Sequence, residues 1–177
     1  FLNYGCYFGT DEEKLRSVVD FIVSQQLAAG GFNCRLNRSG ARHSSMHSTI
    51  SVLEGIREYI AAGYAFRAEE LKRIEGEAQE FLLRHRLFKS DHTGAVIHPI
   101  FLKLVYPPRW RYDILRALDY FQSVGYPYDE RLQDALDILK EKRLSDGRWK
   151  TQAHHPGEVH FQMEQAGKPS RWTTLRC

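Results

Sequence analysis

The sequence predicts an all-α protein that is built from repeated helical hairpins. Apolar residues recur with the period of a buried helical stripe, as Leu71, Ile74, Ala78 and Phe81 do. Similar stretches also recur about 60 residues apart, which indicates a repeat architecture. The 177 residues have room for one domain with its own core, so a single domain over residues 1–177 is expected.

The first class of helix is identified by its end. Three stretches carry a helical apolar pattern that runs into a leucine and a turn: VDFIVSQQLAAGGF (19–32), QEFLLRHRLFKSD (79–91) and LDILKEKRLSDGRW (136–149). Their leucines, Leu27, Leu87 and Leu144, lie 60 and 57 residues apart. These stretches predict helices over 19–29, 68–87 and 131–143. Glycines then let the backbone turn, and Phe32 and Trp149 are expected to pack against the helix ends.

A second class of helix lies between these ends. STISVLEGIREYIAAG (48–63) matches WRYDILRALDYFQSVG (110–125) at an offset of 62. The match predicts helices over 47–62 and 111–124, in a layer separate from the first class. It pairs Leu53 with Leu115, Ile56 with Leu118, and the capping residues Gly63 and Gly125, and the four apolar residues are expected in the core. A third copy begins at SRWTTLRC (170–177), where Leu175 lies 60 residues after Leu115.

One segment departs from the helical pattern. Residues 95–108, AVIHPIFLKLVYPP, are rich in β-branched residues and prolines. They predict an extended excursion with one helical turn around 100–104, inside an irregular insertion over 88–109. All other regular structure is expected to be helical.

Composition excludes several classes of protein. Charged residues make up 27% of the chain and hydrophobic residues 42%, which is ordinary for a globular protein. The net charge of +3 is mild and its cations are scattered among acids, so no nucleic-acid groove is expected. No apolar run reaches the ~20 residues that span a bilayer, and the chain is expected to be cytoplasmic. Three cysteines without CxxC spacing support neither a disulfide framework nor a zinc ribbon.

The repeated helix ends support a family resemblance. The "Q…L…GGF" and "L…DGRW" ends resemble the QW-type repeats of the terpenoid cyclase and protein prenyltransferase superfamily, which folds as an α/α toroid. GGFNC, HPIFLKLVYPPRWRYDILRALDYF and GKPSRWTTLR are similar to a bacterial group of squalene-cyclase-like proteins. The resemblance implies a central cavity at the N-termini of the second-class helices. The chain holds about three hairpins, fewer than the five to seven of a closed toroid, so an incomplete array is expected that associates through its exposed repeat ends.

The characterised reactions of this superfamily are not implied. A protonating triterpene cyclase carries a D-x-D-D acid, and a protein prenyltransferase binds catalytic zinc through a D-x-C pair; the sequence contains neither. It also lacks a phosphate loop, a dinucleotide fingerprint and a G-x-S-x-G elbow. Whether the chain is an enzyme stays open, and no cofactor is predicted.

The first group of candidate site residues lies in CRLNRSGARHSSMH (34–47). Cys34, His43 and His47 are expected to line the cavity, or else to serve as caps and surface groups. If the helix begins by residue 43, the two histidines lie one turn apart, and with Cys34 they form a minor alternative zinc site. Such a site needs a further distant ligand, for which the candidates are Asp91, His92, His154 and His155.

The second group lies at the heads of second-class helices and in the loops before them. PPRWRYD (107–113) and PSRWT (169–173) both contain an Arg-Trp pair, which suits an anion or a carbocation but also suits a structural turn. The predicted ligand-binding residues here are Arg109, Trp110, Tyr112, Glu164, Arg171 and Trp172. The candidate acids and bases are Asp113, His155 and Asp91. All of them are expected to converge with the first group on one cavity.

Three functions fit these observations. The leading hypothesis is a terpenoid-cyclase-like protein that binds or transforms an apolar ligand, an isoprenoid being one candidate, in a central cavity. The second is a non-catalytic helical-repeat module that binds a partner. The third is an α/α-toroid carbohydrate-active enzyme, which requires two carboxylates about 5–10 Å apart, from among Asp91, Asp113 and Glu164.

Overall fold

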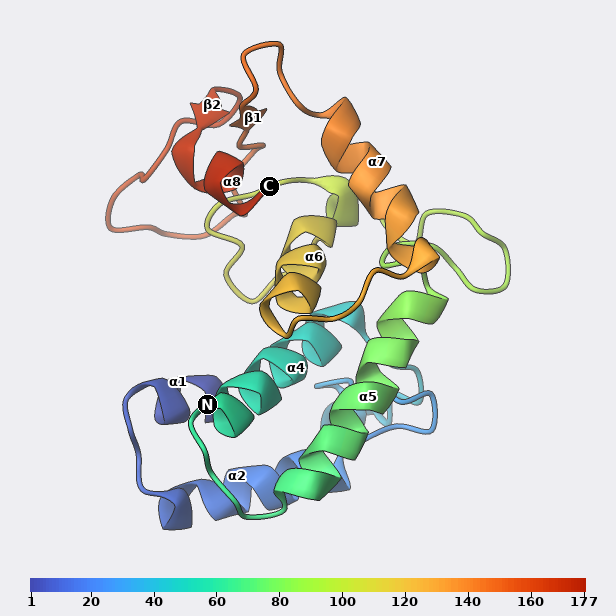
Figure 1. Cartoon of the computed structure of the whole chain (residues 1–177), viewed down its shortest axis with the longest axis vertical. Helices are drawn as coiled ribbons and strands as arrows, with labels where there is room; N and C mark the ends of the chain where they lie inside the picture. The colour runs from blue at the N-terminus through green and yellow to red at the C-terminus, as the bar shows by residue number, and fades with distance from the viewer. The chain divides into compact units, whose positions relative to one another are not determined.

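The computed structural model describes all 177 residues apart from the side chain of Asn37. Helices hold 49% of the residues, and the described residues form only one sheet, of two strands (Figure 1). The predicted all-α class is therefore confirmed in its broad form. The chain divides into two compact units, residues 1–82 and 83–177. A single toroidal domain with two helical layers stays a prediction, because the positions of the units relative to one another are not determined.

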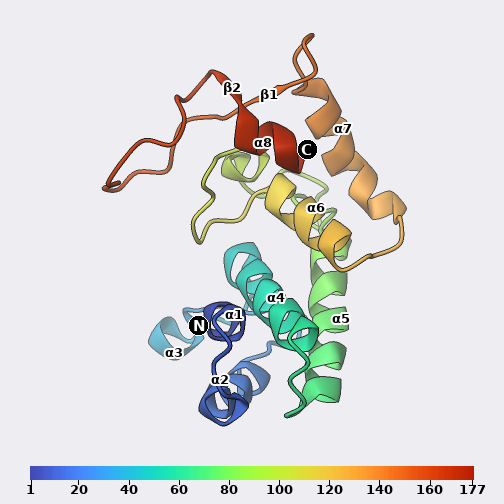
Figure 2. The same cartoon turned by 60° about the vertical axis from the view of Figure 1, so that its left-hand side comes forward.

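Unit 1 is a cluster of helices around α4. Its elements are α1 (Leu2–Tyr7), α2 (Glu12–Ser24), α3 (Leu36–Ser39), α4 (Met46–Ala61) and α5 (Ala68–Arg84), the last of which ends just beyond the unit boundary. Figures 1 and 2 show α4 with α1 on one side and α5 on the other. Leu53 and Ile56 of α4 are completely buried, and Asn3 of α1 donates a hydrogen bond to the carbonyl of Glu54 at 3.2 Å.

The start of α2 is attached to the loop between α4 and α5 by one carboxylate. Oε1 of Glu12 accepts hydrogen bonds from the backbone N–H groups of Ala65 and Phe66, at 2.5 and 2.8 Å, and from the Tyr59 hydroxyl at 3.0 Å. The backbone hydrogen bonds from Phe66 and Ala65 lower the pKa of Glu12, because they favour its charged form. A surface acid thus orders two helix connections that lie more than fifty residues apart in the chain.

Unit 2 combines two longer helices with irregular segments. Its elements are η1 (Pro99–Leu102), α6 (Ile114–Ser123), η2 (Glu130–Leu132), α7 (Gln133–Glu141), β1 (Trp149–Lys150), β2 (Pro169–Ser170) and α8 (Arg171–Arg176). The two strands are antiparallel, with Trp149 opposite Ser170 and Lys150 opposite Pro169. The core is formed by apolar residues of α6 and α7, among them Leu115, Phe121 and Leu139.

The spacing of the observed helix ends confirms the predicted repeat spacing. Each of these helices nevertheless ends before the residue at which the sequence predicted its end. α2, α5 and α7 end at Ser24, Arg84 and Glu141, each three residues before its repeat leucine. The backbone N–H of Leu27 donates to the carbonyl of Gly31 at 2.9 Å, and is therefore not available for a helical bond. The first helix also begins at Glu12, well before the predicted start at residue 19.

The turn after the helix is the same in the first and third copies. Gly30 donates to the carbonyl of Leu27 at 2.8 Å, and Gly147 donates to that of Leu144 at 2.9 Å. Both glycines have positive φ, 89° and 82°, which is strained for residues with a side chain. In the middle copy a longer turn replaces this one, from Ser90 to Ala95, and an isolated bridge joins Lys89 to Val96.

The aromatic residue after each glycine turn is attached to the next helix by a threonine. The backbone N–H of Phe32 donates to the Thr49 hydroxyl at 3.0 Å, and that of Trp149 donates to the Thr174 hydroxyl at 3.0 Å. If these two threonines are equivalent, the first and third copies are offset by 125 residues at this point. The sequence alignment gave an offset of 122, from its steps of 62 and 60. The alignment of the third copy was therefore wrong by three residues, and the expected match of Leu175 to the buried Leu115 fails, since Leu175 is 78% exposed.

The predicted glycine caps are confirmed. Gly63 and Gly125 follow α4 and α6 with positive φ, 79° and 63°. After each glycine, a tyrosine N–H closes the helix end by bonding to the carbonyl five residues earlier, Tyr64 to Tyr59 and Tyr126 to Phe121.

Two expectations about irregular structure need correction. The strands β1 and β2 lie outside residues 95–108, so that segment is not the only non-helical regular structure. Within 95–108 the chain forms the 3₁₀ helix η1, near the predicted turn at 100–104, and no named strand. The short helix α3 was not predicted, because its four residues are too few to show a period.

The core residues give a direct test of the repeat alignment. Leu53, Ile56 and Leu115 are 3% exposed or less, as predicted, but Leu118 is only half-buried. We expect Leu115→Ala to lower the free energy of unfolding by about 2–5 kcal/mol through the loss of a buried side chain, and Leu118→Ala to cost clearly less. Urea unfolding of both variants measures the difference, and equal losses would contradict the described packing of α6.

Candidate functional site

Unit 2 contains a hollow of about 480 Å³. This volume is within the range of small-molecule sites. The hollow is formed by the strand β1 and the loop that follows it, together with Leu104 and the last turn region of α7. Its lining residues are Leu104, Lys142, Lys150, Thr151, Gln152, Ala153, Ala166 and Gly167.

Backbone hydrogen bonds fix the floor of the hollow. Leu104 and Gln152 bind each other twice, because the N–H of Gln152 donates to the Leu104 carbonyl at 2.8 Å and the Leu104 N–H donates to the Gln152 side chain at 2.9 Å. The N–H of Gly167 donates to the carbonyl of Thr151 at 2.8 Å. The hydroxyl of Thr151 accepts from the N–H of Tyr106 at 3.2 Å. Three chain segments are thereby held together, and the hollow does not depend on a ligand for its shape.

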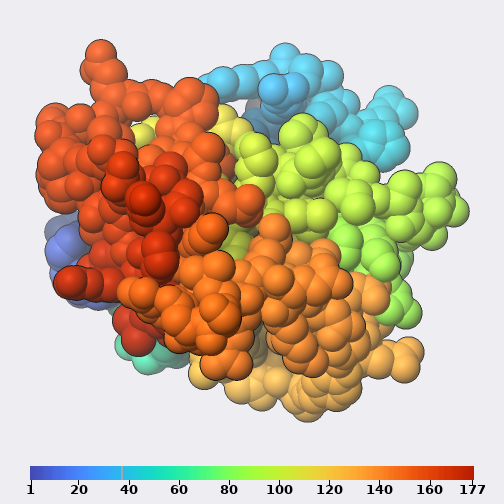
Figure 3. All heavy atoms as spheres, turned by 90° about the horizontal axis from the view of Figure 1, so that it is seen from above, coloured from blue at the N-terminus to red at the C-terminus, as the bar shows by residue number. Residues whose placement is uncertain are grey.

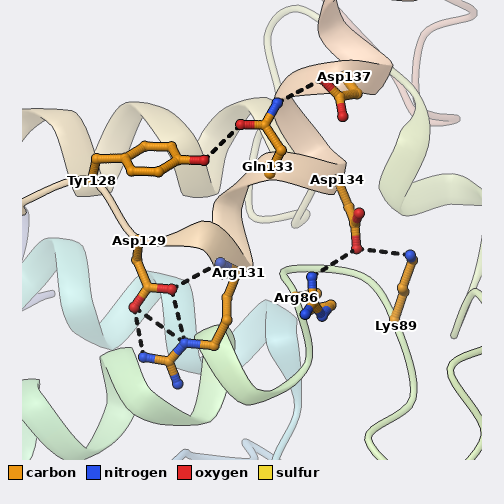
Figure 4. A network of polar contacts seen from close by, with 8 residues as sticks. All are labelled: Arg86, Lys89, Tyr128, Asp129, Arg131, Gln133, Asp134 and Asp137. Carbon is orange, nitrogen blue, oxygen red and sulfur yellow. Dashed lines mark hydrogen bonds and ion pairs between the residues drawn. The ribbon is translucent and has the colours of Figure 1, made fainter.

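The lysines of the hollow differ from Lys89 and Arg86, which are ion-paired. Figure 4 shows Asp134 of α7 bound to Lys89 at 2.8 Å and to Arg86 at 3.4 Å. These cations lower the pKa of Asp134, chiefly through the hydrogen bond from Lys89. In contrast, no ion pair or hydrogen bond within the described residues engages the ammonium groups of Lys142 and Lys150.

The chemistry of the lining favours binding of an anion that has an apolar part. Among the described lining residues there is no Asp, Glu, His or Cys, so the hollow has two positive charges and no compensating negative charge. Ammonium groups bind phosphate and carboxylate oxygens with charge-assisted hydrogen bonds. Leu104, Ala153 and Ala166 supply apolar surface beside them.

Three of the predicted site residues come together at the start of α8. The carboxylate of Glu164 accepts hydrogen bonds from the backbone N–H of Arg171, at 2.8 Å, and from that of Trp172, at 3.4 Å. It also accepts from the Ser170 hydroxyl, which caps the helix by accepting from the Thr173 N–H. Glu164 therefore stabilises a helix start here.

An aromatic pair lies beside this helix start. The ring of Trp172 stacks on that of Tyr106, with centroids 5.4 Å apart and planes 8° from parallel. His154 forms a 2.8 Å hydrogen bond to the backbone carbonyl of Glu164. Nη1 of Arg109 donates to the carbonyl of Pro156 at 3.3 Å, next to the buried His155. Arg109 therefore lies beside the segment that contains His155, and neither residue lines the hollow.

The PPRWRYD cluster separates into an exposed part and a buried part. Trp110 is 60% exposed, and the guanidinium of Arg111 lies 4.9 Å from its ring centre. Tyr112 is 1% exposed and donates its hydroxyl to the carbonyl of Leu87 at 2.5 Å. Asp113 is 3% exposed and caps α6 by accepting from the N–H of Arg116 at 2.8 Å. Tyr112 and Asp113 are core groups of unit 2.

The remaining candidates lie apart from these groups. Oδ1 of Asp91 is 3.6 Å from Nε2 of His85 and 3.7 Å from that of His92. In unit 1, Cys34 and His43 are exposed. α4 begins at Met46, so His43 precedes the helix and does not share a helical face with His47. The geometric premise of the zinc alternative was therefore wrong, and the described residues contain no group of three His, Cys, Asp or Glu side chains suited to a metal ion. Convergence of both units' residues on one cavity stays a prediction.

Sequence reasoning missed the residues of the hollow. Lys142 and Lys150 resemble any surface lysine in the sequence, and Leu104 was assigned to an irregular excursion. The available signal was the repeat position of Lys150, which directly follows the aromatic residue of the third glycine turn.

Comparison with known proteins finds no matching family model, curated protein or solved structure. Among the described residues, no helix is both long and apolar enough to cross a membrane.

Asp113 makes the stability of unit 2 depend on pH. Burial raises its pKa from 3.8 to about 6, although the Arg116 N–H and the nearby guanidinium of Arg176 partly oppose this shift. The folded state then holds the Asp113 proton more tightly than the unfolded state. The stabilisation that this group contributes is fully present below about pH 4 and is lost as the pH rises through about 6. At about 1.4 kcal/mol for each pKa unit, the loss is about 3 kcal/mol.

We expect Asp113→Asn, which keeps a capping oxygen, to remove this part of the pH dependence. Urea unfolding between pH 4 and pH 7 measures it, with the exposed Glu141→Gln in α7 as the control that keeps the slope. An unchanged slope in Asp113→Asn would show that other groups cause it.

Proposed function

We propose that this chain is a helical-repeat protein of the terpenoid-cyclase-like, α/α-toroid type that binds an amphipathic anion, of the isoprenoid phosphate class, in the hollow of unit 2. The observation that carries the proposal is the pair of unpaired lysines beside apolar side chains in a hollow without acidic groups. The repeated helix ends and the family resemblance support the isoprenoid class, because that superfamily binds such ligands in its cavity.

The proposal is for binding, without an assigned reaction. A general acid or base must reach the reacting atoms, and the candidate groups Asp91, Asp113 and His155 do not line the hollow. The side chains of the hollow can hold a head group and cover an apolar tail. The described lining contains no Asp, Glu, His or Cys side chain to act as a general acid or base.

The two alternatives receive less support. A carbohydrate-active enzyme needs two carboxylates facing one cleft. Asp113 and Glu164 are instead engaged at the starts of α6 and α8. A helical-repeat module that binds a partner protein would use a broad exposed face, and the hollow is too small for that role.

The lysines provide the test. We expect Lys142→Met and Lys150→Met each to weaken the binding of farnesyl diphosphate by about tenfold or more, because each removes a charge-assisted hydrogen bond worth roughly 1.5–3 kcal/mol. Isothermal titration calorimetry measures the binding. Lys140→Met is the matched control, since Lys140 lies on the same helix but forms an ion pair with Asp137 and does not line the hollow.

The probe series separates the two parts of the ligand. Farnesol tests the apolar part alone, and inorganic diphosphate tests the head group alone; both should bind more weakly than farnesyl diphosphate. Equal effects of Lys140→Met and Lys142→Met, or no binding of any of the three probes, would refute the proposal.

A further inference from the structure

We infer that the loop of residues 151–168 is a docking surface for an anionic lipid bilayer. The loop leaves β1 and returns to β2, and contains neither a helix nor a strand. Its middle exposes three apolar side chains at alternate positions: Val159 at 61%, Phe161 at 72% and Met163 at 43%. Single exposed apolar residues are common, but three within five residues of one loop form a local apolar cluster that can serve as an interaction surface.

The two ends of the loop are held together, so its middle projects. Thr151 and Lys168 are joined by a backbone hydrogen bond of 3.3 Å, and Thr151 also accepts from Gly167 at 2.8 Å. Further along, His154 bonds to the carbonyl of Glu164 at 2.8 Å. Figures 1 and 2 both show the orange-red loop extending away from the helices of unit 2, and Figure 3 shows an orange-red arm that stands out from the surface.

The charge around the loop suits an anionic surface. Residues 142–177 contain seven Lys and Arg but three Asp and Glu, although the whole chain has a net charge of only +3. Asp146 pairs with Arg148 at 2.7 Å, Arg176 pairs with Asp119 at 3.0 Å, and Glu164 accepts hydrogen bonds from the start of α8, which leaves five cations and one acid, Glu158. Lys142, Lys150 and Lys168 have no acidic partner within the described part of the chain.

An apolar cluster beside excess positive charge is the arrangement by which proteins attach to the surface of an anionic membrane. The apolar side chains enter the boundary of the acyl chains, and the cations are attracted to the head groups. The exposed Trp172 at the base of the loop, 42% exposed, is a residue type that favours the membrane interface. The excess of positive charge around the loop favours an anionic membrane over an apolar groove on a protein partner.

Vesicle flotation with the whole chain tests the inference. We expect binding to vesicles of phosphatidylcholine with 30% phosphatidylglycerol, and weak binding to pure phosphatidylcholine. Salt at about 0.5 M should reduce the bound fraction, because it screens the attraction between exposed charges. The double variant Val159→Ser/Phe161→Ser should bind about tenfold less or weaker still, because it removes most of the inserted apolar area.

The controls separate this inference from the proposed function. Phe21→Ser changes another exposed aromatic residue, in α2 and 56% exposed, and should bind vesicles like the unmodified chain. The double variant should still bind farnesyl diphosphate, since neither Val159 nor Phe161 lines the hollow. Equal binding to both kinds of vesicle, unchanged binding of the double variant, or self-association in light scattering that the double variant abolishes, would overturn the inference.

Discussion

The turn that follows a first-class helix is the constraint on which the rest of the first and third copies depends. After the repeat leucine, a glycine with positive φ reverses the chain, and the next aromatic residue donates its backbone N–H to a threonine of the following helix. A helix end leaves backbone groups without partners, and this turn gives several of them partners at once. The threonine hydroxyl then fixes where the next helix begins relative to the turn.

The same turn positions the hollow of unit 2. Lys150 follows Trp149 directly, and the strand pairing with β2 sets the direction in which the chain continues through Thr151 and Gln152. Gln152 then binds Leu104, a residue 48 positions earlier. The irregular segment around Leu104 therefore has a structural role. It supplies one wall of the hollow, and its backbone forms hydrogen bonds with the loop.

Acidic side chains of unit 2 serve mainly to support helices and loops. Asp113 and Glu164 accept hydrogen bonds at the starts of α6 and α8, and Asp134 binds Lys89 and Arg86. A carboxylate that caps a helix is stabilised by the backbone and has less capacity left for catalysis. Among the cations of this unit that have no acidic partner within the described residues, Lys142 and Lys150 line the hollow, and Lys168 lies at the end of the 151–168 loop.

The sequence by itself determined the helical class, the spacing of the helix ends and the glycine caps, because apolar periodicity and positive φ are local properties of the chain. It placed Leu53, Ile56 and Leu115 in the core for the same reason. It placed the helix ends two to five residues too late and the third copy three residues out of register, since a leucine in a turn has the same apolar character as one in a helix. Only the tertiary structure decided which polar residues meet. The partners of Thr151 and Gln152 are set by hydrogen bonds between segments far apart in the chain, and nothing in the local pattern of residues records those contacts.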